Sequence, residues 1–157
     1  MKIIALDLGS HMALAHNGMD DPIIVDSHHF EGCRSHRMGA TFKWLHKRFT
    51  QIKAACPIDL VVYERPFGRG MDATRCGWGI AGLVEAAATI QGWPVTDTDP
   101  QTIKKFATGK GRAEKEAMIA AARKMGYTGH DEHEADAFCL LKYAEASALI
   151  LPTKGTK

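Results

Sequence analysis

Long hydrophobic runs are missing from this sequence, and none of its apolar stretches approaches the roughly 18 residues that span a bilayer. The N-terminus carries one lysine and a short apolar run that ends at Asp7, so we do not expect a signal peptide. Low-complexity tracts and internal repeats are missing as well. These absences argue against a membrane-bound or repeat-built protein.

Cysteine is scarce, and neither sign of charge dominates. The four cysteines are widely spaced and form no Cys-x-x-Cys pair, which favours a reduced, cytoplasmic setting in a bacterial cell or in the host cell of a virus. The formal net charge is +2, and this balance identifies no partner by itself. The positions of the basic residues therefore carry more information than their number.

The length and composition are those of a globular protein. The 157 residues are 45% hydrophobic and 24% charged. A chain of this size buries about 70% of its unfolded surface as one domain. We therefore expect a single domain over residues 1–157, with residues 152–157 as a short mobile tail.

The segment from Ile3 to Ser10 runs from four apolar residues into Asp7 and then Leu-Gly-Ser. A continuous apolar run bounded by a turn signal is typical of a strand buried on both faces. A carboxylate buried at its end would cost several kcal/mol, roughly, without a partner or a metal. Taken alone, the motif also fits a solvated turn aspartate, because Asp and Gly are ordinary turn residues.

A second apolar run, Leu60–Tyr63, ends in the same way at Glu64, and Pro66 stops the strand. If the two strands are parallel neighbours, Asp7 and Glu64 lie together at the carboxyl ends, where open α/β sheets keep their sites. The alternative is a surface glutamate paired with Arg65.

The rest of the chain predicts an antiparallel start followed by alternating helices and strands. Strands are expected over 12–16 and 22–30, joined by an Asn17-Gly18 turn signal. The histidines and cysteine near this hairpin match no structural-zinc spacing, so a polar loop is favoured. The other expected elements are helices over 38–55, 72–91, 101–106, 113–125 and 135–151, and a strand over 94–98.

Two segments carry the features of a nucleic-acid contact. The loop 67–71 combines Phe67 and Arg69 with glycines, which suits a phosphate-following loop with a stacking ring but equally a plain linker. The chain's one dense basic cluster surrounds Thr108–Gly111, a glycine loop that precedes a helix N-terminus and is not a Walker A motif. A contact to a phosphate backbone is favoured there over a merely solvated loop. The cluster consists of Lys104, Lys105, Lys110, Arg112 and Lys115.

The segment 131–136 leads polar residues into the final apolar helix. Asp131 and Glu134 fit a capping box, so Asp131 is best explained as a helix cap. His133 and Asp136 are three residues apart and share one helix face. Asp136 at the inner edge of that helix would be expensive to bury without a cation, and a capped, solvated first turn is the alternative.

Together these residues indicate a metal-dependent nuclease. Asp7, Glu64, His133 and Asp136 offer mainly oxygen ligands, which suit Mg²⁺ or Mn²⁺. Two such ions can activate water and stabilise the leaving oxygen of a phosphodiester. Asp131 is a lesser candidate ligand, and the basic loop would hold the substrate backbone.

The motifs also resemble those of RuvC-type Holliday-junction resolvases, in the same order and over nearly the whole chain. The matching segments are 3–10, 61–67, 109–115 and 133–137. The resemblance implies an RNase H-like α/β fold, a five-stranded mixed sheet with three antiparallel and then two parallel strands, flanked by helices. It also implies a homodimer that acts in DNA recombination and repair, cutting two opposed strands of a four-way DNA junction with Mg²⁺ or Mn²⁺, two ions being expected.

The motif matches imply a role for individual residues. Asp7, Glu64 and Asp136 would be carboxylate ligands, and His133 stands where many relatives carry aspartate and some carry histidine. Whether His133 ligates or acts on a proton, or Asp131 does so instead, stays open. Helix 72–91 corresponds to the dimerisation element of the family. The predicted catalytic residues are Asp7, Glu64, His133, Asp136 and Lys115, the last near the scissile phosphate.

The predicted DNA contacts come from the same matches and from the basic loop. Lys104 matches a basic position on the DNA path, and Phe67 lies beside the position of the loop aromatic that contacts the junction centre. The predicted DNA-binding residues are Phe67, Arg69, Lys104, Lys105, Lys110, Arg112 and Lys115.

Other functions compete with a junction resolvase. An RNA-processing nuclease of the RNase H-like group would use the same metal chemistry, and a structure-specific DNA-binding module would use the basic residues without catalysis. An actin-like nucleotide-binding protein shares the Asp-x-Gly-Ser signature, but it needs two paired domains, for which 157 residues are too few.

Overall fold

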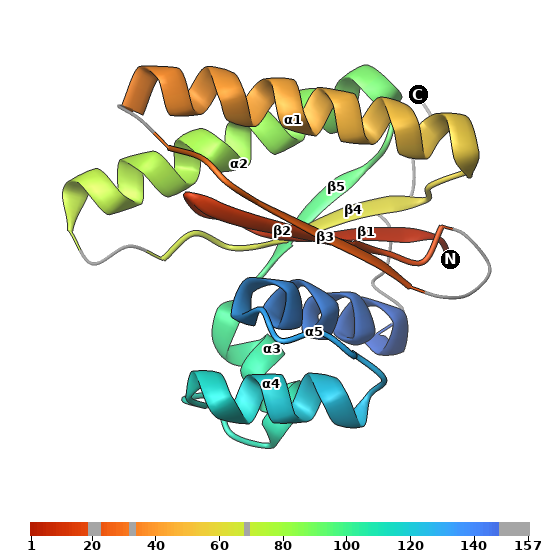
Figure 1. The fold of residues 1–157 in the computed structure, drawn as a ribbon, viewed down its shortest axis with the longest axis vertical. Helices are drawn as coiled ribbons and strands as arrows, with labels where there is room; N and C mark the ends of the chain where they lie inside the picture. The colour runs from red at the N-terminus through yellow and green to blue at the C-terminus, as the bar shows by residue number, and fades with distance from the viewer. Residues whose placement is uncertain (19–22, 32–33, 68–69, 148–157) are drawn as a thin grey trace, which may run out of the picture.

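A mixed β-sheet forms the middle layer of the computed structural model, with helices on both of its faces (Figure 1). The structure describes residues 1–18, 23–31, 34–67 and 70–147. Helices α1 and α2 cover one face, while α3, α4 and α5 lie on the other. No helix in these ranges is both long and apolar enough to cross a membrane.

The sheet has five strands in the order β3-β2-β1-β4-β5. The pairings β3–β2 and β2–β1 are antiparallel, and the pairings β1–β4 and β4–β5 are parallel. This arrangement confirms the predicted fold class. The strands are β1 (Ile3–Asp7), β2 (His11–His16), β3 (Ile24–His29), β4 (Leu60–Glu64) and β5 (Val95–Thr98).

The helices follow the predicted order, with shifted ends. α1 begins four residues before 38 and α5 begins three residues before 135, and the expected end of the last helix at 151 lies outside the described residues. The α5 shift has a clear cause, since Asp131 Oδ1 accepts the Glu134 N–H at 3.0 Å and so caps the helix ahead of its first apolar residue. The helices are α1 (Arg34–Ala55), α2 (Met71–Gln91), α3 (Pro100–Thr108), α4 (Lys115–Lys124) and α5 (Glu132–Ser147).

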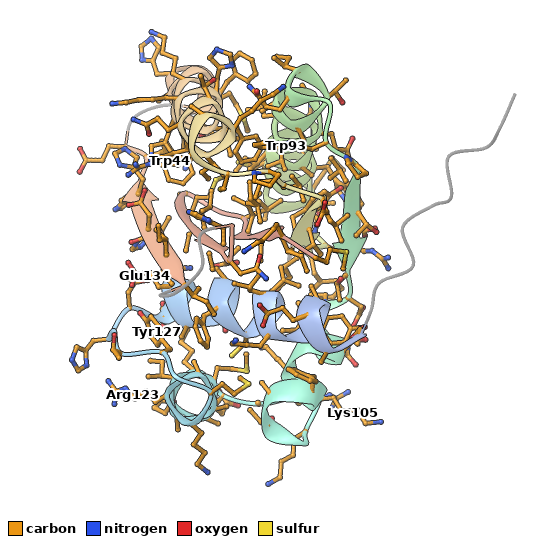
Figure 2. All side chains as sticks on the ribbon, turned by 90° about the vertical axis from the view of Figure 1, so that its right-hand side faces the viewer. Trp44, Trp93, Lys105, Arg123, Tyr127 and Glu134 are labelled. Atoms are coloured by element: carbon orange, nitrogen blue, oxygen red, sulfur yellow. The ribbon has the colours of Figure 1, made fainter. Side chains whose placement is uncertain are left out.

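Alternate residues of the central strands fill two separate cores. In β1, Ile4 and Leu6 pack with the core beneath α1 and α2, whereas Ile3 and Ala5 pack with the core beneath α5. All four side chains are fully buried, so β1 is a strand covered on both faces as the apolar run predicted. The side chains of both layers are drawn in Figure 2. Because the period is two, the next residue on the α5 face of β1 is Asp7.

The glycines of α2 have different surroundings. A Cβ on Gly77 would lie 2.7 Å from Pro66 Cβ, and one on Gly79 would lie 3.3 Å from Met38 Cε. These two positions therefore permit close packing within one chain. A Cβ on Gly82 would have no atom within 4 Å, so this position faces open space.

One domain over residues 1–157 stays a prediction, and its expected tail, 152–157, lies outside the described residues.

Candidate active site

Two parallel strands bring two carboxylates to one edge of the sheet. Ile3 pairs with Leu60, and Leu6 with Tyr63, so β1 and β4 run in step to their carboxyl ends. Asp7 and Glu64 are each the last residue of their strand and point to the α5 face. The sequence predicted this juxtaposition from the repeated pattern of an apolar run that ends on an acid.

Asp136 on α5 approaches the same place from the helical side. Burial, and then the negative charge of Asp7, raises the pKa of Asp136 from 3.8 to about 7. Burial, followed by the charges of Asp7 and Asp136, raises the pKa of Glu64 from 4.5 to about 8. Each carboxylate therefore lies within the field of the others, and their simultaneous ionisation is costly without a cation.

Asp136 has an unsatisfied atom at this point. Its Oδ1 is buried and has no hydrogen-bond partner in the described part of the protein. A buried carboxylate oxygen normally accepts at least one hydrogen bond, so this atom requires an explanation. A bound cation is one that fits its charge.

Basic side chains near the carboxylates compensate their charge only in part. The charge of Lys104 on α3 opposes the rise in pKa of both Glu64 and Asp136. Arg65 does not pair with the adjacent Glu64 but forms an ion pair with Asp97. The alternative interpretation of Glu64 as a surface residue paired with Arg65 is therefore wrong.

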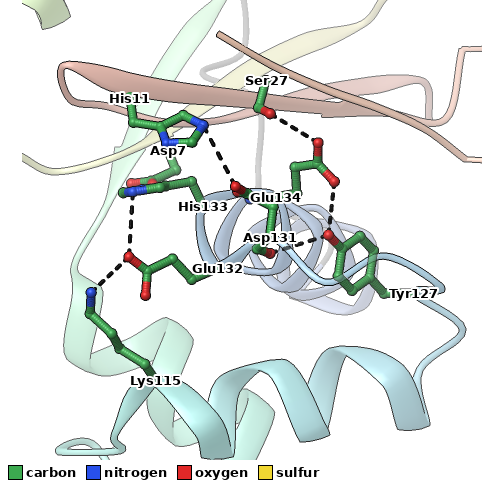
Figure 3. Close-up of polar contacts among 9 residues, drawn as sticks. All are labelled: Asp7, His11, Ser27, Lys115, Tyr127, Asp131, Glu132, His133 and Glu134. Atoms are coloured by element: carbon green, nitrogen blue, oxygen red, sulfur yellow. Dashed lines mark hydrogen bonds and ion pairs between the residues drawn. The ribbon is translucent and has the colours of Figure 1, made fainter. Parts of the chain in front are cut away.

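His133 lies beside Asp7. Its Nδ1 is 2.7 Å from Asp7 Oδ2, and this hydrogen bond raises the pKa of the imidazole (Figure 3). The side chain of Asp7 is only 16% exposed, and His133 is the hydrogen-bond partner that the described structure gives it. The first turn of α5 thus brings His133 and Asp136 to the strand ends, as the spacing of three residues predicted.

His11 was not among the predicted site residues. Its ring lies against His133, with centroids 4.4 Å apart, and its Nε2 is 3.6 Å from Asp131 Oδ2. His29 also stacks on His11, with ring centroids 5.7 Å apart. The strand register pairs His11 with His29. That register, which the sequence left undetermined, is the signal that would have identified this row of histidines.

Glu134 faces away from the carboxylate site, and Asp131 lies at its margin beside His11. Asp131 caps α5, as predicted. The reciprocal half of the capping box is wrong, because the Glu134 carboxylate instead accepts hydrogen bonds from Ser27 Oγ at 2.9 Å and Tyr127 Oη at 2.8 Å (Figures 2 and 3). Glu134 therefore joins β3 to the segment before α5.

Lys115, expected near the scissile phosphate, is held by an acid in this structure. Its Nζ donates to Glu132 Oε1 at 2.7 Å, although the lysine side chain is 71% exposed. Glu132 Oε1 also lies 3.6 Å from His133 Nε2. A chain of polar contacts therefore runs from Lys115 through Glu132 and His133 to Asp7.

The remaining predicted DNA contacts are exposed or undescribed. Lys110 and Arg112 are exposed, and Lys105 points outward from α3 (Figure 2). Phe67 is 87% exposed, whereas Arg69 lies outside the described residues.

The glycine loop is closed rather than open to an anion. Gly109 adopts φ 79° and donates its N–H to Lys105 O, which ends α3. The Lys110 N–H donates to Thr108 Oγ1. These two backbone N–H groups are therefore satisfied within the protein and do not face an anion.

The donor set fits a hard divalent cation. The described residues contain no ready-made group of three or more His, Cys, Asp or Glu ligands around one point. Asp7, Glu64 and Asp136 nevertheless supply three carboxylates whose pKa values and unsatisfied oxygen favour an added positive charge. His133 adds a nitrogen donor, which Mn²⁺ also accepts.

Known proteins share this architecture. No protein-family model matches the sequence, and no curated protein matches it significantly. RuvC from Thermus thermophilus is 22% identical, with a TM-score of 0.67 over 94% of this chain and 97% of that one. RuvC from the same organism in complex with a Holliday junction substrate is 21% identical, with a TM-score of 0.72 and 94% of each chain covered. This chain has the RuvC fold.

A less similar solved structure also shares this fold. The yeast mitochondrial Holliday junction resolvase Ydc2 is 12% identical, with a TM-score of 0.50 over 88% of this chain and 75% of its own. The resemblance drawn from the motifs is therefore confirmed at the level of the fold.

Proposed function

We propose that this protein is a divalent-metal-dependent endonuclease that resolves four-way DNA junctions. The observation that carries the proposal is the unpaired, buried Oδ1 of Asp136 beside two further carboxylates at the strand ends. A purely structural site would satisfy that oxygen with a donor. Its place in a RuvC fold supports phosphodiester hydrolysis as the chemistry.

The metal would be held by Asp7, Glu64, Asp136 and His133. Bound Mg²⁺ or Mn²⁺, in one or two sites, supplies Lewis-acid stabilisation of the charge that develops on a phosphodiester. Because Asp131 Oδ1 is committed to capping α5, His133 is the better candidate for the fourth ligand. The contact with Asp7 Oδ2 would orient the imidazole and favour a proton on Nδ1.

Basic side chains would hold the DNA backbone next to the carboxylates. Lys104 is close enough to act on Glu64 and Asp136, so it can attract a phosphate toward them. Lys115 lies on the other side of His133, at the start of α4. A branched substrate is favoured because a RuvC with this fold is known in complex with a Holliday junction.

A homodimer through α2 would pair two such sites. Trp78 is 48% exposed and Met71 is 78% exposed on this helix, and Phe67 precedes it. Gly82 adds a position where a second backbone can approach closely.

Replacing Gly82 by arginine fits the space in one chain, so we expect a folded monomer in light-scattering measurements where the wild type is dimeric. A wild-type monomer at all accessible concentrations would contradict this part of the proposal.

A cleavage assay tests the proposed activity. A four-way DNA junction, a linear duplex of the same arms and a structured RNA are offered with Mg²⁺ or Mn²⁺, and Asp7→Asn is the control. We expect paired nicks in the junction, weak cleavage of the duplex and none by the control. Preferential cleavage of RNA would indicate an RNA-processing nuclease, and junction binding without cleavage in either metal would indicate a binding module.

A further inference from the structure

Glu132 lies between two residues of the proposed site, and neither the motifs nor the metal chemistry assigns it a role. Its Oε1 accepts a hydrogen bond from Lys115 Nζ at 2.7 Å and lies 3.6 Å from His133 Nε2 (Figure 3). The contact joins the first residue of α5 to the first residue of α4. The protein thus supplies a carboxylate of its own to the lysine that is expected to contact DNA.

We propose that Glu132 is a positioning residue that competes with a DNA phosphate for Lys115 and thereby lowers the affinity of the protein for DNA. This inference rests on the proposed function, which places a phosphate near Lys115. In the free protein, the Glu132 carboxylate is hydrogen-bonded to the Lys115 ammonium group. On DNA, the ammonium group binds a phosphate oxygen in place of Glu132, and the Glu132 carboxylate remains beside His133.

The exposure of the pair makes this exchange feasible. The side chains of Lys115 and Glu132 are 71% and 35% exposed, so water screens their attraction. Exposed ion pairs are weak enough that a phosphate, which also releases condensed counterions, can displace the acid. The cost of breaking the pair nevertheless reduces the affinity for every DNA that uses Lys115, by up to about fivefold.

The effect should not depend on the shape of the DNA. A lysine–phosphate contact positions the backbone but reads neither bases nor branch geometry. Removing the competing acid should therefore tighten binding to a junction and to a linear duplex by the same factor. The preference for the junction, expressed as a ratio of affinities, should stay unchanged.

Glu116 provides a matched control. It is exposed, adjacent to Lys115 and carries the same charge, which also acts on the lysine, but the hydrogen-bonded ion pair in the described structure is with Glu132. Glu116→Gln therefore removes the same net charge without removing the pair. Only the long-range attraction for DNA should rise in this variant, by less than about twofold at physiological salt because of screening.

The experiment measures DNA binding by fluorescence anisotropy without divalent metal, for the full chain and its Glu132→Gln, Glu116→Gln, Lys115→Gln and Glu132→Gln/Lys115→Gln variants. We expect Glu132→Gln to bind both DNAs more tightly than Glu116→Gln does, by up to about fivefold relative to wild type. In the Lys115→Gln background, Glu132→Gln should add no more than the long-range effect. Thermal unfolding checks that all variants fold.

Two outcomes would overturn the inference: no tighter binding by Glu132→Gln than by Glu116→Gln, or equal tightening in the Lys115→Gln background. Failure of the proposed function is separate and visible in the wild type, as absence of junction preference and of cleavage. The competition at Lys115 can then still be measured on linear duplex.

Discussion

Glu134 and Asp136 are two residues apart in α5, yet their surroundings are opposite. Glu134 accepts hydrogen bonds from Ser27 and Tyr127. Asp136 faces Asp7 and Glu64 and leaves one buried oxygen without a partner. The first acid has the bonding of a structural residue. The second imposes an electrostatic cost that a functional site can explain.

Glu134 and Asp136 lie on opposite sides of the start of α5. The outer side of α5, toward β3, is satisfied by the protein itself. The inner side, toward β1 and β4, requires something the chain does not supply. Substitutions on the two sides should therefore have opposite effects on activity and on stability.

The largest expected difference is in catalysis. Asp136→Asn, like Asp7→Asn, should lower junction cleavage by about three orders of magnitude, because a lost metal ligand removes several kcal/mol of transition-state stabilisation. Glu134→Gln, with the same chemical change two residues away, should stay within about threefold of wild type per folded molecule. Single-turnover cleavage rates measure both. Equal losses of cleavage rate in Asp136→Asn and Glu134→Gln would contradict the distinction between the two sides of α5.

Stability should respond in the opposite way on the outer side. Glu134→Ala removes the acceptor of the Ser27 hydroxyl and the nearer acceptor of the Tyr127 hydroxyl, which keeps only Asp131 O at 3.1 Å, so the free energy of unfolding should fall by about 1–3 kcal/mol. Urea unfolding followed by circular dichroism measures the change. Glu116→Ala, on α4, is the control for loss of an exposed acid. A smaller loss for Glu134 than for Glu116 would contradict the structural role.

On the inner side, removal of a charge should stabilise the metal-free protein. The pKa of Glu64 rises from 4.5 to about 8 on folding, so the folded state binds more protons in this window and stability falls as the pH rises through it. Glu64→Gln should therefore be more stable than wild type at pH 8, by on the order of 2 kcal/mol.

The pH dependence distinguishes this effect from a general one. The advantage of Glu64→Gln should shrink toward zero as the pH approaches 4.5, where the carboxyl is protonated in both states. Urea unfolding in chelator across this pH range measures it. A pH-independent difference would show that the carboxylates do not repel each other as their placement implies.

The smallest expected effect is stabilisation by metal. Mn²⁺ should raise the midpoint of thermal unfolding more at pH 8 than near pH 6, because the ligands must lose protons before they bind. Asp7→Asn should reduce the shift, and Glu134→Gln should retain it. A shift of the same size in Asp7→Asn would place the ion elsewhere.

The sequence predicted the parts of the fold and site that depend on local pattern. The apolar runs that end at Asp7 and Glu64 indicated two parallel strands, and the spacing of His133 and Asp136 indicated a shared helix face. Each of these signals lies within a few consecutive residues, and one sheet topology brings them together.

The sequence did not predict features that depend on strand register or on the direction of side chains around a helix. His11 stacks on His29 only because β2 pairs with β3 in one register. Lys104 and Lys105 diverge because successive residues of α3 point in different directions around the helix, which leaves Lys104 near the carboxylates and Lys105 pointing outward. The role of Glu134 depends on Tyr127 and Ser27, which come from different segments.

The central claim, that the inner side of α5 faces a divalent-metal site, is tested most directly by a crystal structure of the protein soaked in Mn²⁺. Anomalous scattering should show manganese against the carboxylates of Asp7, Glu64 and Asp136, with Asp136 Oδ1 among its ligands. His133 rather than Asp131 should complete the set. An unaltered His133–Asp7 hydrogen bond with no anomalous peak beside these carboxylates, at saturating Mn²⁺, would contradict the claim.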